Sequence, residues 1–242
     1  MAFTNEKFKL PSNGTLEGVP AEVTLRNMTT AEEKMLLGSA EDVFDQIIKK
    51  CVVEPADFDI DKIPMMDKNF LYVMLRSVSY GPDYKFEYIC PECGRRSVAE
   101  ISLDDLEVTY LPKDFKEIFD VITLPVCGDK ISLKLPRNSD FTKVRNRVRQ
   151  FQAKFPDAVG DEGWVFGMMA FIAEINGKEV DSSLHDYVND LHVKDVGYLR
   201  HRINKLEGGI ERNYTVHCPK CNSDVEVPIP MGANFFHTDF DD

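Results

Sequence analysis

Residues 84–93 read YKFEYICPEC, and residues 212–221 read RNYTVHCPKC. In both stretches a strand-like run leads into a Cys-x-x-Cys pair. Gly94 and Asn222 follow the two pairs, and both residue types suit the left-handed turn that such a knuckle requires. Two knuckles of this kind complete the tetrahedral four-sulfur shell that zinc prefers. We therefore expect one structural zinc ion per chain, bound by Cys90, Cys93, Cys218 and Cys221.

The predicted zinc is structural, because four cysteines leave no coordination position for a substrate. Between Cys93 and Cys218 lie 124 residues, and closing a loop of that length costs on the order of 5 kcal/mol. A structural zinc ion contributes roughly 10–16 kcal/mol near neutral pH. Metal binding is thus expected to hold the middle of the chain to its end. The alternatives are disulfides, two separate redox pairs or free buried thiols, and we expect Cys51 and Cys127 to be ordinary core cysteines.

Composition limits the classes of function. The chain has 242 residues, 43% of them hydrophobic, and 41 acidic against 29 basic residues give a net charge of −12. That charge argues against nucleic-acid binding, which is the common use of zinc knuckles. No apolar run approaches the 18 or so residues of a membrane span. We therefore expect protein partners.

The order of predicted elements indicates an α+β fold of mixed helices and short antiparallel strands, with the split knuckle pair resembling a zinc ribbon. Four segments are expected: an extended N-terminal arm (1–20), a helical part (21–82), an α+β body carrying both knuckles (83–230) and a C-terminal tail (231–242). The arm is inferred from its polar, proline- and glycine-punctuated sequence.

Local signals place the individual elements. A capping-box pattern at Thr29–Glu33 predicts a helix to about Leu37, and Asp67 is expected to cap a helix that Gly81 ends. Asn176-Gly177 predicts a type I′ hairpin turn. Strands are expected at 22–26, 85–89, 97–101, 121–124, 130–135, 214–217 and 224–227, and helices at 43–51, 70–80, 141–155, 164–172 and 195–206.

The helix expected at 141–155 carries a dense run of positive charge: Lys143, Arg145, Arg147, Arg149 and Lys154. One interpretation is a contact face for an acidic partner, with Arg145 and Arg149 as partner-binding residues. The other is a solvated face that balances the acidic remainder of the chain. In the tail, Phe235 and Phe236 are expected either to insert into a groove on a partner or to fold into the chain's own core.

The sequence contains no glycine-rich phosphate loop, no Gly-x-Ser-x-Gly elbow and no His-Glu-x-x-His pair. Its five histidines are scattered, and His217 beside Cys218 could compete as a metal ligand only if a cysteine did not bind. We therefore expect no enzymatic activity. A zinc-dependent or thiol enzyme is the alternative, and it would need an open metal position or a cysteine of low pKa.

Short pieces along nearly the whole chain carry a resemblance to a known family. They are Leu10-Pro11-Ser12, Thr30–Glu33, Cys51-Val52 with Pro55, Leu75-Arg76, Ser79-Tyr80-Gly81, the first knuckle, 207–210, the second knuckle and 228–236. Their order resembles the baseplate hub and hub-assembly proteins of T-even-like contractile-tailed bacteriophages.

This resemblance implies a non-enzymatic structural component of the baseplate, in the hub or near it, that holds neighbouring subunits together. Its partners would be other baseplate and tail proteins, with self-association in a symmetric assembly. It would reside in the virion tail and pass through the host cytoplasm during assembly. The alternatives are a transient hub-assembly chaperone absent from the mature virion, and a zinc-ribbon nucleic-acid-binding protein.

Overall fold

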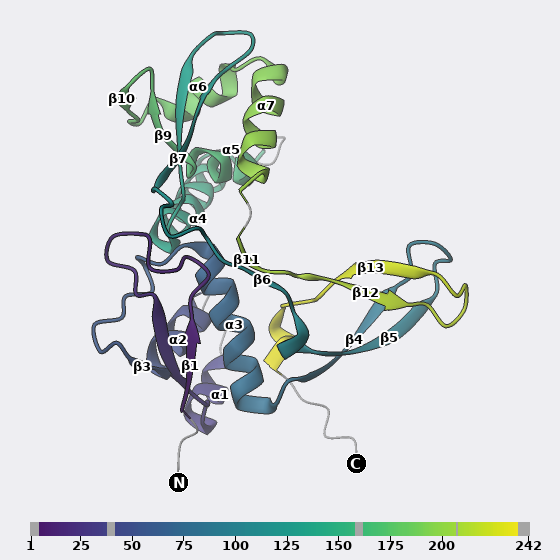
Figure 1. The fold of residues 1–242 in the computed structure, drawn as a ribbon. Helices are drawn as coiled ribbons and strands as arrows, with labels where there is room; N and C mark the ends of the chain where they lie inside the picture. The colour runs from purple at the N-terminus through teal and green to yellow at the C-terminus, as the bar shows by residue number, and fades with distance from the viewer. Residues whose placement is uncertain (1–4, 38–41, 158–161, 207, 237–242) are drawn as a thin grey trace.

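The structure, a computed structural model, describes residues 5–37, 42–157, 162–206 and 208–236. It has the predicted α+β class, with helices and short antiparallel sheets. Two hydrophobic clusters organise it. The first is built around α3 (Met65–Tyr80) and the second around the sheet of β7 to β10. Figure 1 shows these two parts one above the other, with a pair of hairpins projecting to one side.

A three-stranded antiparallel sheet covers one side of α3. Its strands are β1 (Asn5–Lys9), β2 (Glu22–Arg26) and β3 (Val52–Glu54), in the order β1-β2-β3. Two helices precede α3: α1 (Thr30–Leu36) and α2 (Val43–Cys51). The Thr29 side chain accepts a hydrogen bond from Ala31 N, and the Glu32 carboxylate accepts one from Thr29 N. The predicted capping box is therefore confirmed.

The N-terminal segment differs from the expected extended arm. Strand β1 pairs along its length with β2, and Leu10 is fully buried in the first cluster. Ser12 donates from its backbone N–H and its hydroxyl to the Asp67 carboxylate, at 2.8 and 2.5 Å. Residues 5–20 thus pack on the body, because their few apolar side chains, although widely spaced, all reach the core.

Asp67 also has a different place from the one predicted. Helix α3 begins at Met65, with Pro64 as the capping residue. Asp67 therefore lies within the first helical turn, where its side chain is fully buried and bonded to Ser12. The helix dipole favours a carboxylate in the first turn. An aspartate near the start of a helix therefore fits either the N-cap or the first turn, and the sequence alone does not distinguish the two positions.

The projecting hairpins carry the cysteines. They are β4 (Asp83–Ile89) with β5 (Arg96–Ser102), and β12 (Asn213–His217) with β13 (Asp224–Pro228). We call these four strands the knuckle hairpins. Their side chains alternate between buried and exposed, as a half-buried strand requires. The inward residues belong to the first cluster: Tyr84, Phe86, Tyr88, Ala99, Ile101, Val216, Val225 and Val227.

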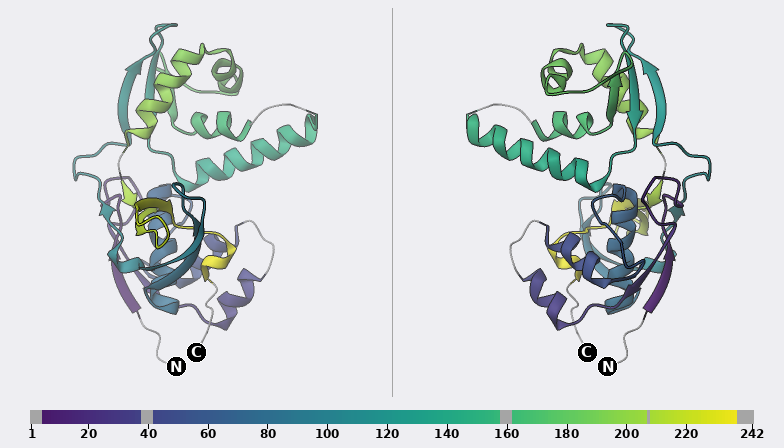
Figure 2. Two further views of the ribbon diagram at one scale, coloured as in Figure 1. Left: turned by 90° about the vertical axis from the view of Figure 1, so that its right-hand side faces the viewer. Right: turned by 90° about the vertical axis from the view of Figure 1, so that its left-hand side faces the viewer.

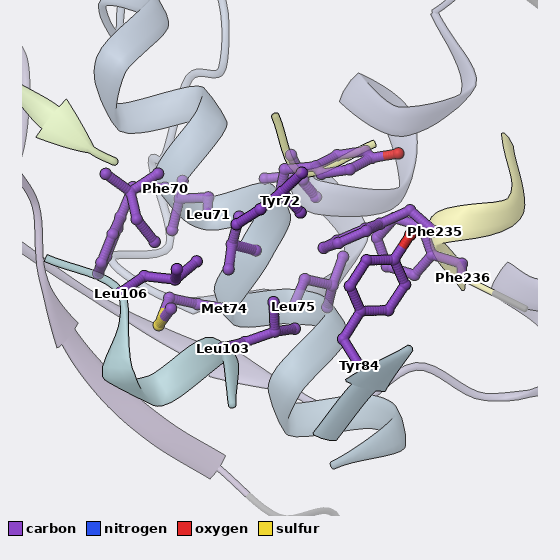
Figure 3. Close-up of a cluster of buried hydrophobic side chains, with 14 of the residues drawn as sticks. Phe70, Leu71, Tyr72, Met74, Leu75, Tyr84, Leu103, Leu106, Phe235 and Phe236 are labelled. Carbon is purple, nitrogen blue, oxygen red and sulfur yellow. The ribbon is translucent and has the colours of Figure 1, made fainter. Parts of the chain in front are cut away.

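The end of the described chain folds into the same core. Within η2 (Ala233–Phe236), Phe235 and Phe236 are 0% and 2% exposed. The Phe235 ring stacks on Tyr72 at 5.2 Å, and the Arg76 side chain donates to the Phe235 carbonyl oxygen at 3.1 Å. Figure 3 shows both phenylalanines pointing at α3 beside Tyr72 and Tyr84. Of the two alternatives that the sequence left open, the structure shows the internal one.

The second cluster lies between a four-stranded sheet and four helices. The strands, in spatial order, are β10 (Lys178–Glu179), β9 (Ile172–Ile175), β8 (Lys130–Lys134) and β7 (Ile118–Thr123). The helices are α4 (Asn138–Lys154), α5 (Glu162–Met169), α6 (Leu184–Asp190) and α7 (Val193–Asn204). Asn176 and Gly177 both have positive φ, which confirms the predicted turn.

Three details of this part differ from the sequence prediction. Ile172 begins a strand instead of ending a helix, and α6 was not predicted at all. Helix α4 starts three residues earlier than expected and includes Asn138, while Arg137 occupies the capping position. Asp140 accepts a hydrogen bond from Arg137 N at 3.0 Å, so the capping carboxylate comes from inside the helix.

The two clusters meet at a narrow junction. Strand β6 (Val108–Thr109), which follows η1 (Leu103–Asp105), pairs with β11 (Gly209–Ile210). Arg137 donates to the carbonyl oxygens of Glu17 and Lys62 and forms an ion pair with Glu117. These contacts tie the start of α4 to the first cluster. The four segment boundaries predicted from the sequence stay predictions.

Candidate metal centre

The four predicted ligands come together at the tip of the knuckle hairpins. The Sγ atoms of Cys90 and Cys221 are 3.7 Å apart, and those of Cys93 and Cys218 are 3.8 Å apart. All four sulfur atoms lie within 4.8 Å of one another. The close pairs each join one hairpin to the other, so the arrangement is a cross-link between two segments that are distant in sequence.

Each knuckle is a tight turn whose backbone is determined locally. Gly94 N donates to Cys90 O, and Asn222 N donates to Cys218 O, both at 2.9 Å. Gly94 and Asn222 have φ values of 68° and 61°, as predicted. A side chain with a branched Cβ would be strained there. The turn places the two sulfurs of each pair on the side that faces the other hairpin.

Burial raises the pKa values of the thiols, whereas hydrogen bonds from backbone amides lower them. Cys90 and Cys218 are fully buried, whereas Cys93 and Cys221 are half-buried. The backbone amides of Cys221 and Lys220 lower the pKa of Cys218 to about 6, and the amide of Ser223 lowers the pKa of Cys221. Burial raises the pKa of Cys90 to about 11. The backbone of the second knuckle thus favours the thiolate forms of Cys218 and Cys221. A bound cation would offset the free-energy cost of ionising the buried Cys90 thiol in the first knuckle.

The sulfur positions fit a zinc ion. Zn–S bonds of about 2.3 Å in a regular tetrahedron place neighbouring sulfurs roughly 3.8 Å apart. Two of the six sulfur–sulfur separations, 3.7 and 3.8 Å, match that value, and the others are at most 4.8 Å. A disulfide requires sulfurs at about 2.05 Å, so these pairs are not bonded to each other. Four sulfur donors also exclude a bound substrate at the metal, because a tetrahedral ion has no further position.

His217, the potential competing ligand, is engaged elsewhere. Its Nδ1 lies 2.9 Å from Asp224 Oδ1, and its Nε2 lies 3.0 Å from Asn222 Oδ1. The hydrogen bond with Asp224 raises the pKa of the imidazole. Both ring nitrogens are therefore occupied by oxygen partners on the exposed side of the second knuckle.

The other two cysteines differ from each other. Cys51 is fully buried, as expected, and burial raises the pKa of its thiol to about 11. The prediction that Cys127 is a core cysteine is wrong, because it is exposed in the loop between β7 and β8. The apolar neighbours Pro125 and Val126 are exposed as well, so an apolar sequence context did not indicate burial here.

The predicted partner-binding arginines lie on α4. Arg145 is half-buried, and its guanidinium donates to Thr142 Oγ1 at 2.9 Å. Arg149 is exposed one turn further along the helix. Their role in binding a partner stays a prediction. The other predicted pair, Phe235 and Phe236, is buried in the first cluster.

Sequence reasoning missed several buried polar sites, and two of them join distant parts of the chain. Arg76 is 3% exposed and donates to the carbonyl oxygens of Gly81, Asp83 and Phe235. Its position in the apolar stripe of α3 was the available signal. Asn138, fully buried, bonds to Asp45 and to Lys68, which also form an ion pair. No local pattern indicates that network, because its members are far apart in sequence.

The model of one protein family, described as T4 bacteriophage base plate protein, matches residues 1–237. No curated protein and no solved structure matches the chain. Because the family model covers nearly the whole sequence, the chain belongs to this family. The resemblance to baseplate proteins is thereby confirmed, and the narrower assignment to the hub stays a prediction. Within the described residues, no helix is long and apolar enough to cross a membrane.

Proposed function

We propose that the protein is a non-enzymatic structural component of a contractile phage tail baseplate, in the hub or next to it. The family match over residues 1–237 carries this proposal. In this role the chain holds neighbouring subunits together by protein–protein contacts. It resides in the tail of the virion and passes through the host cytoplasm during assembly.

A zinc ion bound by Cys90, Cys93, Cys218 and Cys221 would make the knuckle hairpins rigid. The spacing and burial of the four sulfurs support this assignment. Each hairpin has only two strands, and isolated two-stranded hairpins are marginally stable at best in water. A metal cross-link at their far end would therefore hold the two hairpins to each other, in addition to the packing of their inner faces in the first cluster.

The charge distribution supports contacts with protein neighbours. The chain has a net charge of −12, which suits basic faces on adjacent subunits. Helix α4 has the opposite character, with Arg145 and Arg149 among its cations, and would contact an acidic surface. The same net charge disfavours the nucleic-acid-binding alternative, because that class of protein depends on a basic surface.

Quantitative mass spectrometry of purified phage particles tests the structural role. A resident subunit is expected at a fixed copy number relative to the other baseplate proteins in mature particles. A chain present in assembly intermediates but absent from mature particles would instead identify the chaperone alternative. Zinc analysis of the same fractions tests metal binding separately from the structural role, since the metal is expected wherever the folded chain is found.

A further inference from the structure

An open depression of about 450 Å³ lies at the C-terminal end of α4. It is lined by Phe151, Lys154, Phe155, Pro156 and Asp157. The Phe155 ring is 46% exposed, so it presents an apolar surface to the depression. Figure 2 shows α4 extending outward from the body of the molecule. We call this depression the α4 groove.

The floor of the α4 groove is held in place from behind. The rings of Phe151 and Phe155 are 4.9 Å apart, and Phe151 also meets the edge of Phe166 at 6.4 Å. The Phe166 ring stacks on His185 at 4.8 Å, and His185 is bonded to Glu162 at 2.9 Å. Phe151 is therefore packed against the second cluster, and Phe155 packs on Phe151. Such packing before a ligand binds lowers the cost of binding.

The rim of the α4 groove holds one cation, Lys154, and the exposed face of α4 that leads to it carries further cations. Lys154 Nζ lies 5.2 Å from the centre of the Phe155 ring. Lys143 and Arg147 do not line the groove, but they are exposed at helical spacing on the same face of α4 as Phe151. Lys143 also forms an ion pair with Asp140. Asp157 is the one carboxylate among the lining residues. An aromatic floor with this rim suits a segment that presents one aromatic ring flanked by carboxylates.

The chain itself contains such a segment. Residues 238–242, which lie outside the described residues, read TDFDD. Phe240 is flanked there by Asp239 and Asp241, and Asp242 follows. The six residues after Phe236 span at most about 20 Å. Phe236 is anchored in the first cluster, whereas the α4 groove borders the second, on a helix that extends away from the body.

We propose that the α4 groove binds the acidic C-terminal segment, residues 238–242, of a second copy of this chain. Phe240 would pack on the exposed ring of Phe155, and the aspartates on either side would meet Lys154 and, further along the same face of α4, Arg147. Each copy would place its tail in the α4 groove of the next copy. Such a head-to-tail contact closes into a ring if the rotation between copies allows it. One such contact is weak, and several in a closed ring reinforce one another.

A labelled peptide measures the contact directly. A fluorescein-labelled peptide with the sequence of residues 237–242 is titrated with the full chain, and binding is followed by fluorescence anisotropy. Replacing Phe240 by alanine in the peptide is expected to weaken binding about tenfold or more, because one buried phenylalanine ring is lost. Phe155→Ser and Lys154→Glu in the protein are expected to weaken it too. Lys34→Glu, the same charge change at an exposed site on α1, is the matched control.

A complementation experiment identifies the second copy as the occupant. In sedimentation velocity, the full-length Phe240→Ala and Lys154→Glu chains are each expected to associate less than the wild type. A mixture of the two is expected to form a dimer, because one retains an intact groove and the other an intact tail.

Two results would overturn the proposal. The first is equal peptide affinity for the wild-type, Phe155→Ser and Lys154→Glu chains, each confirmed as folded by circular dichroism. The second is a rise in peptide affinity for the Phe240→Ala chain with unchanged self-association, because this shows that the tail occupies its own groove. Both experiments use the chain alone, so their failure would leave the structural role proposed above untouched.

Discussion

The side chain of Asp67 shows how a single residue fixes the N-terminal segment. It is fully buried in the first turn of α3 and accepts two hydrogen bonds from Ser12. Burial raises the pKa of this carboxyl to about 7, against the opposing effect of the Ser12 bonds. Residues 10–20 are thus attached to the body through a group whose charge changes near neutral pH.

Asp67 is expected to make stability depend on pH between about 4 and 7. The unfolded carboxyl titrates near 3.9, so within this window the folded state binds more protons than the unfolded state. Its contribution to stability is therefore greatest at low pH and falls as the pH rises through 7. Asp67→Asn should remove this dependence, and urea unfolding at pH 5 and pH 8 measures it. Between pH 5 and pH 8 the wild type should lose a few kcal/mol of unfolding free energy, and Asp67→Asn should not show this loss.

Ser12→Ala serves as the companion variant. It removes one donor to the buried carboxylate and is expected to cost about 1–3 kcal/mol at pH 8. An Asp67→Asn stability difference that stays constant from pH 5 to pH 8 would contradict the account of this site.

Single residues also show what sequence can and cannot predict. The Thr29–Glu32 capping box and the turns at Gly94 and Asn222 were predicted correctly, because their partners lie within a few positions. Asp67 was misplaced because its partner, Ser12, lies 55 residues away. Arg76 was overlooked for the same reason, since Phe235 is 159 residues away. Only the folded chain brings such pairs together.

At the scale of elements, β11 depends on a close approach to α3. Gly209 has a φ of +104°, and a Cβ at this position would lie 3.1 Å from Met66 Cβ. Strand β11 also pairs with β6, so the same two residues of backbone contact α3 and close the junction between the clusters. A side chain here would force β11 away from the helix.

Gly209→Ala is expected to destabilise the protein by about 2–4 kcal/mol, from backbone strain together with the clash against Met66. Gly128→Ala is the matched control, because Gly128 also has positive φ but nothing lies within 4 Å of its Cβ position. Thermal unfolding of both variants measures the difference. Equal losses would mean that the approach to α3 carries no cost beyond backbone strain.

The elements differ in how well the sequence predicted them. The knuckle hairpins carry alternating side chains and specific turn residues, and their strands were placed to within a few positions. For Asn176-Gly177 the sequence predicted the turn but not strand β9. Helix α6 was missed, since it is only seven residues long and its stability comes from packing of Leu184 and Val188. Short helices are marginal without tertiary contacts.

For the whole molecule, the junction decides whether the two clusters act as one body. Arg137 bridges them with its ion pair to Glu117 and its bonds to the carbonyl oxygens of Glu17 and Lys62. Its side chain is 17% exposed, so these bonds are partly shielded from water. Beside it, the network of Asn138, Asp45 and Lys68 joins α4 to α2 and α3.

Arg137→Met is expected to lower stability by about 2–3 kcal/mol, because it removes charged hydrogen bonds at a shielded site. Amide hydrogen exchange should show lost protection near residues 17, 62 and 117, with the knuckle hairpins unchanged. Arg96→Met is the control, since Arg96 forms an exposed pair with Glu87 on β4 and such pairs contribute about 0–1 kcal/mol. A similar loss in both variants would contradict a bridging role for Arg137.

The four-cysteine cluster concerns the whole molecule too, because two of its members come from the middle of the chain and two from residues 218–221. The sequence predicted that these four cysteines would lie together, since each knuckle has a local turn signal and zinc requires four donors. That they bind zinc stays a prediction. The sequence could not predict that the centre would sit at the tip of two projecting hairpins. That position follows from the packing of their inner faces into the first cluster.

Native mass spectrometry of the purified wild-type chain, beside its cysteine variants, tests this centre most directly. The account predicts one zinc ion per folded chain in the wild type and in the Cys127→Ser and Cys51→Ser variants. Cys90→Ser and Cys221→Ser should lose the metal and unfold with a stability lower by on the order of 5–10 kcal/mol. A wild-type chain that folds without metal, or equal zinc in all five proteins, would contradict it.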